Sequence, residues 1–145
     1  GRMSSAAKVG AALAGYVGLL NRRCTVATLG GALPTLDLIL PTYRWGSYVR
    51  GYIGYLASVI HDDSEDICLH IGDNSCNLEK HQFLKSLKSP KVRLHLHPTN
   101  LGVHPNVTYL LHHSEGEFIL LLGDDDWIHP TAFAQAGFLR RNPEC

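Results

Sequence analysis

The sequence shows no excess of charge of either sign. Its 13 lysine and arginine residues balance 13 aspartate and glutamate residues, and its basic runs are no longer than the pairs Arg22-Arg23 and Arg140-Arg141. A chain without a net positive field has no general attraction for nucleic acid or for an anionic membrane. We therefore expect no nucleic-acid partner.

The sequence also lacks paired cysteines. Its 4 cysteines, Cys24, Cys68, Cys76 and Cys145, are widely separated and form no Cys-x-x-Cys motif. This spacing argues against a zinc ribbon and against a small disulfide-stapled scaffold. It favours a reducing compartment, and we expect a cytoplasmic protein.

No apolar stretch is long enough to span a bilayer, which takes about 18 to 20 consecutive apolar residues. The nearest, Val9–Leu20, has three interpretations: a marginal helix or disordered leader, a segment lying on the inner face of a membrane, or the apolar core of a signal peptide without a clear cleavage site. A Gly-rich stretch, Thr25–Pro34, follows it. We expect residues 1–34 to be leader and linker, and residues 35–145 to be the folded domain.

After residue 35 the chain alternates short β-type runs with helical apolar patterns, and 45% of its residues are hydrophobic. This alternation predicts an α/β fold with a doubly wound, mostly parallel sheet flanked by helices. Pro41 is expected to end the first strand, and the uninterrupted apolar run of the fourth predicts a strand covered on both faces. The expected strands are 36–40, 67–71, 92–97 and 117–122, and the expected helices are 47–61, 78–87 and 106–113.

The apolar spacing also predicts which side of two helices faces the core. These side chains recur at helical intervals. In residues 47–61 they are Tyr48, Tyr52, Ile53, Leu56, Val59 and Ile60, and in residues 78–87 they are Leu78, Phe83, Leu84 and Leu87.

Polar residues follow the end of every predicted strand. In doubly wound sheets, ligands bind outside the carboxyl ends of the strands, so these residues are the candidates for a binding site. They are Pro41-Thr42-Tyr43, Asp73-Asn74-Ser75, Asn100-Leu101-Gly102 and Asp124-Asp125-Asp126.

Three consecutive aspartates, Asp124, Asp125 and Asp126, follow the fourth predicted strand. Neighbouring carboxylates repel one another, and no lysine or arginine stands near them in the sequence. A divalent cation would relieve the repulsion, and Mg²⁺ commonly uses one or two protein carboxylates together with substrate phosphates. The alternative is an Asp-rich turn that caps the following segment. Their place after a buried strand favours the metal site, with His129 as a candidate neighbour of the metal or phosphate.

The other strand-end residues each have a binding role and a structural alternative. Asp73 could accept a hydrogen bond from a pyrimidine ring N–H, or cap a turn. Tyr43 offers an aromatic face to a base, or ordinary packing. Asn100, Gly102 and Asn106 fit a tight turn and the start of a helix.

The 9 histidines give no clear metal motif. His95 and His97 alternate along one face of a predicted strand and in principle share a metal, but a half-exposed strand face explains them better. His112 and His113 are adjacent on a predicted helix and do not face each other.

Four segments taken together, LDLILPTYR, HIGDNSCN, NLGVHPN and SEGEFILLLGDDDWIHP, occur in an order that resembles the N-terminal half of a family 2 glycosyltransferase with a GT-A fold. The resemblance covers about Leu36 to Arg141. It implies an inverting transferase that passes a sugar from a nucleotide diphosphate donor to a hydroxyl of a glycan or lipid-linked acceptor. It also implies Mn²⁺ or Mg²⁺ on the diphosphate.

The resemblance implies roles for the strand-end residues. Asp73 would recognise the base, Asp124 would approach the ribose, and Asp125, with Asp126 as second choice, would bind the metal. The remaining members of the implied nucleotide pocket are Pro41, Thr42, Tyr43, Asn100, Gly102 and Asn106.

The chain departs from the family pattern at three places. Arg44 stands where the family usually has asparagine, and it could meet a phosphate. Gly123 stands at the first position of the aspartate cluster. The catalytic base of the family lies further downstream, so we expect it after Cys145, with the present chain a C-terminally truncated domain.

Two other functions remain open. A nucleotide-diphosphate-sugar binding module, or half-enzyme without its own base, would use the same residues without turnover. An unrelated α/β phosphotransferase with an aspartate nucleophile is less favoured, because such enzymes place their aspartates after the first strand, where this chain has Pro41-Thr42-Tyr43.

Overall fold

The computed structural model describes residues 36–62, 66–142 and 144. The expectations for residues 1–34 therefore concern a segment outside the described residues. Within the described part of the chain, no helix has the length and apolar character needed to cross a membrane.

The described residues form a four-stranded sheet in the order β3-β2-β1-β4, in which every neighbouring pair is parallel. This arrangement confirms the predicted doubly wound α/β fold. The helix α5 lies beyond the elements predicted from the sequence. In chain order the elements are β1 (Leu36–Thr42), α2 (Ser47–Asp62), β2 (Ile67–Asp73), α3 (Leu78–Ser86), β3 (Val92–Leu96), α4 (Val103–His113), β4 (Phe118–Leu121) and α5 (Thr131–Arg141).

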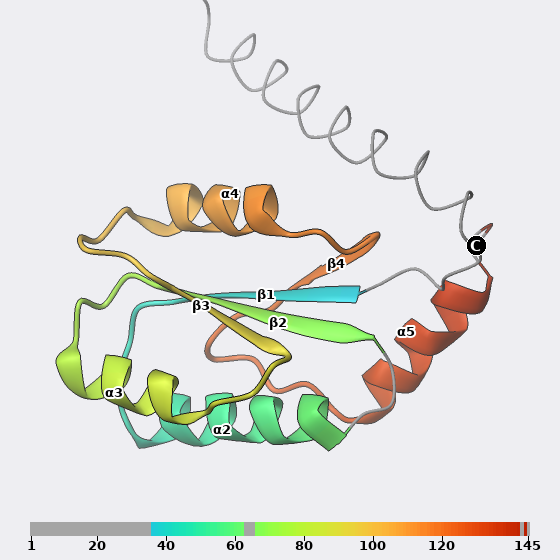
Figure 1. Cartoon of the computed structure of the whole chain (residues 1–145), viewed down its shortest axis with the longest axis horizontal. Coiled ribbons are helices and arrows are strands. Elements are labelled where there is room, and N and C mark those ends of the chain that lie inside the picture. The colour runs from blue at the N-terminus through green and yellow to red at the C-terminus, as the bar shows by residue number, and fades with distance from the viewer. Residues whose placement is uncertain (1–35, 63–65, 143, 145) are drawn as a thin grey trace, which may run out of the picture. The chain divides into compact units, whose positions relative to one another are not determined.

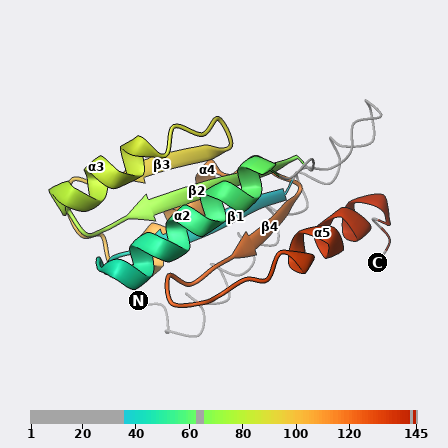
Figure 2. The ribbon, with the colours of Figure 1, turned by 90° about the horizontal axis from the view of Figure 1, so that it is seen from below.

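Helices cover both faces of the sheet (Figure 1). The helix α4 packs on one face over β1 and β2, and α2 and α3 lie on the other face. Seen from below, α2 runs along β1 and β2 while α3 lies beside β3 (Figure 2). The strand order reverses between β1 and β4, which is the position where doubly wound sheets bind ligands at the carboxyl ends of their strands.

The main core lies between the sheet and α2. Tyr52, Ile53, Leu56 and Ile60 of α2 are fully buried, as the helical spacing predicts. Each buried side chain of this size contributes about 1.5–3 kcal/mol relative to exposure. Tyr48 does not belong to this set: it is 53% exposed, because it lies in the first turn of α2, and Val49 is buried instead.

The second helix shows the same kind of error at its start. Leu84 of α3 is fully buried and Phe83 packs against the core, but Leu78 is 78% exposed. Leu78 is the first residue of α3. The exposed member of each predicted set therefore lies at the start of its helix.

Pro41 does not end β1, which continues to Thr42 with Pro41 opposite Gly72. The carbonyl of Ile39 accepts a hydrogen bond from the Leu122 N–H, so alternate residues of β1 turn their backbone groups toward β4. Because β4 ends at Leu121, the missing N–H of Pro41 faces a position without a partner strand. Proline is tolerated in a strand where it interrupts no ladder hydrogen bond.

The prediction that the fourth strand is covered on both faces is wrong for the described residues. Leu120 and Leu121 of β4 are 39% and 54% exposed. The strand pairs with β1 alone and forms one edge of the described sheet. An uninterrupted apolar run shows that both faces of a strand are apolar, and it does not show that other elements of the same segment cover them.

The helix α4 begins at Val103, earlier than the predicted start at Asn106. Its N-cap is Gly102, whose φ of 86° and ψ of 167° form a conformation that side chains other than glycine rarely adopt. Asn106 is therefore inside the helix and buried. Its amide donates to the Gly72 carbonyl at 2.8 Å, and its oxygen pairs with His97 Nε2 at 2.9 Å, so it fastens α4 to β2.

Candidate functional site

The carboxyl ends of β1 and β2 and the loop after β4 converge beside the first turn of α2. Thr42 ends β1, Asp73 ends β2, and Asp124 follows β4 by three residues. The sheet therefore brings three of the predicted site regions to one edge, as parallel strands require.

The three consecutive aspartates have different environments. Asp124 is half-buried and its Oδ2 accepts from Thr42 Oγ1 at 2.9 Å. Asp126 Oδ2 accepts from the Gly123 N–H at 3.0 Å, so this carboxylate caps its own turn. Asp125 is exposed, and among the described residues no group pairs with its carboxylate. The Asp125 side chain is thus the one most available to an added cation.

Gly123 at the start of this loop leaves room for the carboxylates that follow it. A Cβ at Gly123 would lie 2.8 Å from an Asp126 oxygen and 2.9 Å from an Asp125 oxygen. Such contacts are closer than real side chains make, so the two carboxylates can fold back toward the end of β4 only because position 123 has no side chain.

A pocket of about 300 Å³ lies against the loop. Residues 44–49 line it together with Asp124 and Asp125. Its wall thus combines Arg44 and the N-terminus of α2, which begins at Ser47, with Asp124 and Asp125. A helix N-terminus and an arginine both favour phosphate, and carboxylates favour a cation.

Aromatic contacts attach the segment after the aspartates to α2. The Trp127 ring stacks on Tyr55 with 4.6 Å between centroids, and the Tyr55 hydroxyl donates to the Ile128 carbonyl at 3.1 Å. Nearer the aspartates, the Tyr48 hydroxyl donates to the Asp125 carbonyl at 3.2 Å. Tyr48 therefore contacts the loop, although the sequence predicted it to be in the core.

Lys80 joins two of the strand ends beneath the pocket. Its side chain is fully buried, and Nζ lies 2.7 Å from Asp73 Oδ1. The ammonium also donates to Thr42 Oγ1 and to the Arg44 carbonyl, each at 2.8 Å. Since the Thr42 hydroxyl in turn donates a hydrogen bond to Asp124, a continuous chain of hydrogen bonds runs from α3 to the loop after β4.

Asp73 completes this network at the end of β2. Its Oδ2 accepts from Ser75 Oγ at 2.7 Å and lies 2.8 Å from His81 Nε2. Burial by itself raises the pKa of Asp73, but the hydrogen bonds from Lys80 and Ser75 outweigh burial and hold that pKa below its ordinary value. Burial lowers the pKa of Lys80, although Asp73 opposes this change. Asp73 and Lys80 form a fully desolvated ion pair. Removing one partner of such a pair strongly lowers the stability of a protein.

The remaining predicted residues form a second cluster at the end of β2. Asn74 Nδ2 donates to the Gly102 carbonyl at 2.9 Å, and Asn74 Oδ1 accepts from the Leu101 N–H at 3.2 Å. Asn100 Oδ1 accepts from the Gly102 N–H at 2.9 Å. These bonds shape the loop before α4, and none of these residues lines the 300 Å³ pocket.

Residues 37–137 match the family model described as glycosyl transferase family 2. This match covers more than half of the chain. The chain belongs to glycosyltransferase family 2.

Solved structures share the fold of this family 2 domain. TarS from S. aureus, residues 1–349, superposes with a TM-score of 0.58 and 22% identity over 74% of this chain and 32% of that one. The mannosyltransferase PcManGT from Pyrobaculum calidifontis, solved with GDP-Man and Mn²⁺, has a TM-score of 0.58 and 15% identity over 88% of this chain and 41% of that one. The chain thus spans less than half of either structure. No curated protein sequence matches the chain significantly.

Two residues of the candidate site were not predicted from the sequence. Lys80 lies four residues before the buried Leu84, and this shared helical face was the available signal. Tyr48 was predicted to lie in the core, and its contact with Asp125 depends on a segment 77 residues away. His129 Nδ1 lies 3.0 Å from Thr131 Oγ1 at the start of α5, and its role as a neighbour of the metal or phosphate stays a prediction.

Proposed function

We propose that this domain binds a nucleotide diphosphate sugar and transfers the sugar to a hydroxyl acceptor with inversion, using Mn²⁺ or Mg²⁺. One observation carries the proposal: the pocket at the sheet edge combines Arg44 and the N-terminus of α2 with the carboxylates of Asp124 and Asp125. A metal-bound diphosphate has the matching pattern, because its phosphate oxygens need cationic and N–H partners and its cation needs carboxylates. Membership of glycosyltransferase family 2 supports the same reaction class.

The proposed metal ligand is Asp125, with Asp126 as the second candidate. Carboxylate oxygens are hard ligands of the kind that Mg²⁺ and Mn²⁺ prefer. Asp125 is exposed beside the pocket and has no partner among the described residues, whereas Asp126 would have to release the Gly123 N–H. The solved mannosyltransferase contains Mn²⁺ together with GDP-Man, which supports a cation of this type here.

The proposed nucleotide contacts come mainly from β1 and the loop after β4. Tyr43 is 59% exposed, so its ring is available for a base. Asp124 would face the ribose while Thr42 and the Tyr43 N–H hold its carboxylate at 2.9 and 3.4 Å. Pro41 directly precedes Thr42 in β1 and is included in the proposed nucleotide pocket. Asn100, Gly102 and Asn106 would not contact the nucleotide directly. They would support the pocket by shaping the loop before α4.

Base recognition by Asp73 remains a prediction. Its carboxylate is fully buried and already bonded to Lys80, Ser75 and His81. A base N–H would reach it only after one of these partners moves. The observed contacts favour a supporting role, in which Asp73 holds Lys80 and thereby the Thr42–Asp124 hydrogen bond.

The chemistry of transfer follows from charge. A bound divalent cation would neutralise the diphosphate leaving group as the bond to the sugar breaks. Arg44 and the N-terminal amides of α2 would hold the phosphates in place, and the base that deprotonates the acceptor hydroxyl is expected outside the described residues. We also propose that the acceptor is a glycan or a lipid-linked molecule and that the protein associates peripherally with a membrane.

Calorimetric titration with UDP-, GDP- and dTDP-sugars, with and without Mn²⁺, tests the donor site. We expect at least one donor to bind in a Mn²⁺-dependent way, and Asp125→Ala to weaken that binding by about tenfold or more, since a ligand to the cation is lost. Asp62→Ala, which removes an exposed aspartate from the end of α2, should bind like the wild type. Absence of Mn²⁺-dependent binding to the wild type would rule out the proposed site.

The same samples distinguish an enzyme from a binding module. Sugar transfer to an acceptor, or slow hydrolysis of the donor, would support the transferase. Mn²⁺-dependent donor binding without either reaction would support a nucleotide-sugar binding module that lacks its own base.

A further inference from the structure

A second cluster of ligand-type side chains lies at the opposite edge of the sheet. Asp37 is the second residue of β1 and is paired in register with Cys68 of β2. Cys68 and His70 alternate along β2, so both side chains point to the face covered by α4. One ligand atom from each of Asp37, Cys68 and His70 lies within 4.8 Å of the others. Among the described residues, these three side chains form the group that could hold a metal ion.

Neighbouring groups hold two members of the cluster in fixed orientations. Asp37 Oδ2 accepts from the Glu115 and Gly116 N–H groups at 2.7 and 2.8 Å. His70 Nε2 points at the same carboxylate at 3.3 Å, and His70 Nδ1 lies 3.2 Å from His95 Nε2. Metal-binding histidines usually engage their second ring nitrogen in this way, which fixes the orientation of the ring.

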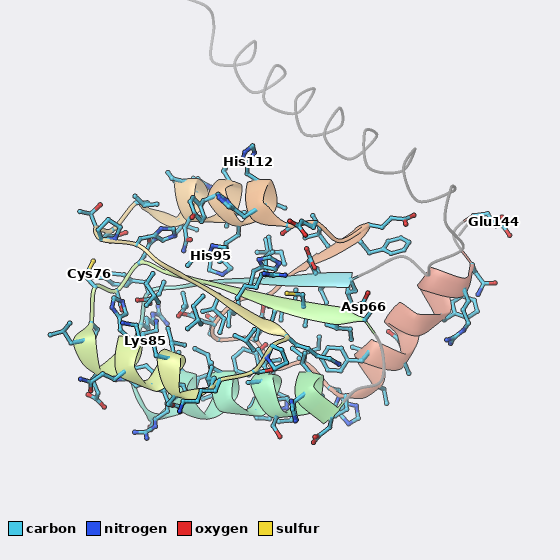
Figure 3. The ribbon with its side chains drawn as sticks, viewed as in Figure 1. Asp66, Cys76, Lys85, His95, His112 and Glu144 are labelled. Carbon is cyan, nitrogen blue, oxygen red and sulfur yellow. The ribbon has the colours of Figure 1, made fainter. Side chains whose placement is uncertain are left out.

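The cluster opens into a pocket of about 180 Å³. Asp66, Glu115 and Arg93 line the pocket in addition to the cluster itself. The lining therefore contains three carboxylates, counting Asp37, and two basic side chains, those of Arg93 and His70, so the carboxylates are in excess. Figure 3 shows Asp66 and Cys76 at opposite ends of β2, so this pocket lies away from the strand ends that form the donor site.

We infer that Asp37, Cys68 and His70 form a binding site for a zinc-type divalent cation, with water from the pocket at the open position. A thiolate, an imidazole and a carboxylate are a ligand set that suits Zn²⁺, whereas Mg²⁺ and Mn²⁺ prefer the all-oxygen set near Asp125. The chain would then hold two different metals at opposite edges of its sheet. The zinc-type ion would join β1, β2 and, through Asp37, the loop at Glu115 and Gly116. This inference is independent of the proposed function.

Cobalt titration of the full chain tests the site, because Co²⁺ bound to a thiolate gives a charge-transfer band that oxygen ligands cannot give. The starting protein carries Cys24→Ser and Cys145→Ser, so that Cys68 and Cys76 are the remaining thiols. We expect Co²⁺ to give this band, and we expect the band to disappear when Zn²⁺ displaces Co²⁺. The Cys68→Ser variant should lack the band, and the Cys76→Ser variant should show it. Cys76 is exposed and belongs to the other end of β2, which makes it the matched control.

Histidine variants examine the second ligand and its support. His70→Gln and His95→Gln should each weaken Co²⁺ binding by about tenfold or more. His112→Gln should leave it unchanged, because His112 is exposed on the outer side of α4 (Figure 3). Asp125→Ala should also leave the band unchanged, which separates this site from the donor-site metal.

Thermal unfolding gives a readout that does not depend on the folding of the Cys68→Ser variant. Saturating Zn²⁺ should raise the melting temperature of the starting protein, and Cys76→Ser should retain this shift. The inference is overturned if the starting protein shows neither a thiolate band nor a Zn²⁺-dependent shift. It is also overturned if Cys76→Ser abolishes the band and Cys68→Ser does not.

Discussion

At the scale of single residues, Lys80 has the environment that its type suggests least. Lysine is almost never fully buried unless it is paired, and here it bonds to Asp73, Thr42 and the Arg44 carbonyl. The residue thereby determines where Thr42 presents its hydroxyl to Asp124. Lys80 is a positioning residue for the candidate site, because it reaches the pocket only through these neighbours.

Replacement of Lys80 by methionine should destabilise the domain strongly. The variant keeps a long apolar chain but leaves the buried Asp73 carboxylate without its cation, a loss of about 3–5 kcal/mol in the free energy of unfolding. Urea unfolding measures this loss in the free energy of unfolding. The matched control is Lys85→Met on the same helix, where the side chain is exposed and the expected change is within about 0.5 kcal/mol. Equal urea midpoints for the two variants would show that the buried pair is not important for stability.

Asp73 should give the domain a distinct sensitivity to acid. Its pKa in the folded state is below the ordinary value of 3.8, so ionised Asp73 stabilises the fold above that pH, and the contribution is lost as the pH falls through the folded-state pKa. Asp73→Asn should therefore be much less stable than the wild type at neutral pH, and the gap should narrow below about pH 4. Urea midpoints measured across this range test it, with Asp62→Asn as the exposed control. A gap that stays constant with pH would contradict the assignment.

The role of a residue could be predicted from the sequence only where its place relative to a neighbouring strand or helix determines that role. The aspartates after β4 were identifiable because they directly follow an apolar run that forms a strand. Lys80 was not, because its burial depends on Asp73, Thr42 and Arg44, which come from two other elements. The hydrogen bond from Thr42 in β1 to Asp124 was beyond prediction, because it joins segments 82 residues apart, whereas the capping of a turn, which Asp126 does through the Gly123 amide, was one of the predicted alternatives.

At the scale of elements, the loop before α4 depends on the unusual backbone of Gly102. Alanine there should destabilise the domain by about 1–3 kcal/mol, because a side chain is strained at this φ and ψ. Gly51→Ala in α2 is the matched control, since a Cβ at Gly51 meets nothing within 4 Å and alanine is the better helix former by about 1 kcal/mol. Thermal unfolding should shift in opposite directions for the two variants. A change in melting temperature of the same sign for both variants would contradict the proposed backbone strain of a side chain at position 102.

The elements themselves were predictable because their signals are local. Helical spacing identified α2 and alternating or continuous apolar runs identified the strands. The errors lie where a distant segment decides the outcome. Pro41 remains in β1 because β4 ends early, and Leu121 is exposed because no described element covers it.

At the scale of the whole molecule, the order β3-β2-β1-β4 places the reversal of the sheet beside α2. The loop with Asp124 and Asp125 then meets the start of α2 and residue Arg44 at one pocket. No local signal contains this order. The sequence analysis did not predict the strand order. It predicted the doubly wound α/β fold from the alternation of strands and helices and from the resemblance to glycosyltransferase family 2, and the structure and the family match confirm that fold.

The central claim is that the aspartate loop is completed only when a cation and a diphosphate arrive together. Binding of two ligands that contact each other is reciprocally coupled. Electron paramagnetic resonance of Mn²⁺ measures the coupling directly, because the signal of free Mn²⁺ disappears on binding. We predict that a saturating nucleotide diphosphate which the protein binds raises its affinity for Mn²⁺ by about tenfold or more, and that Asp125→Ala abolishes this gain. Equal Mn²⁺ affinity with and without the nucleotide in the wild type would contradict the account.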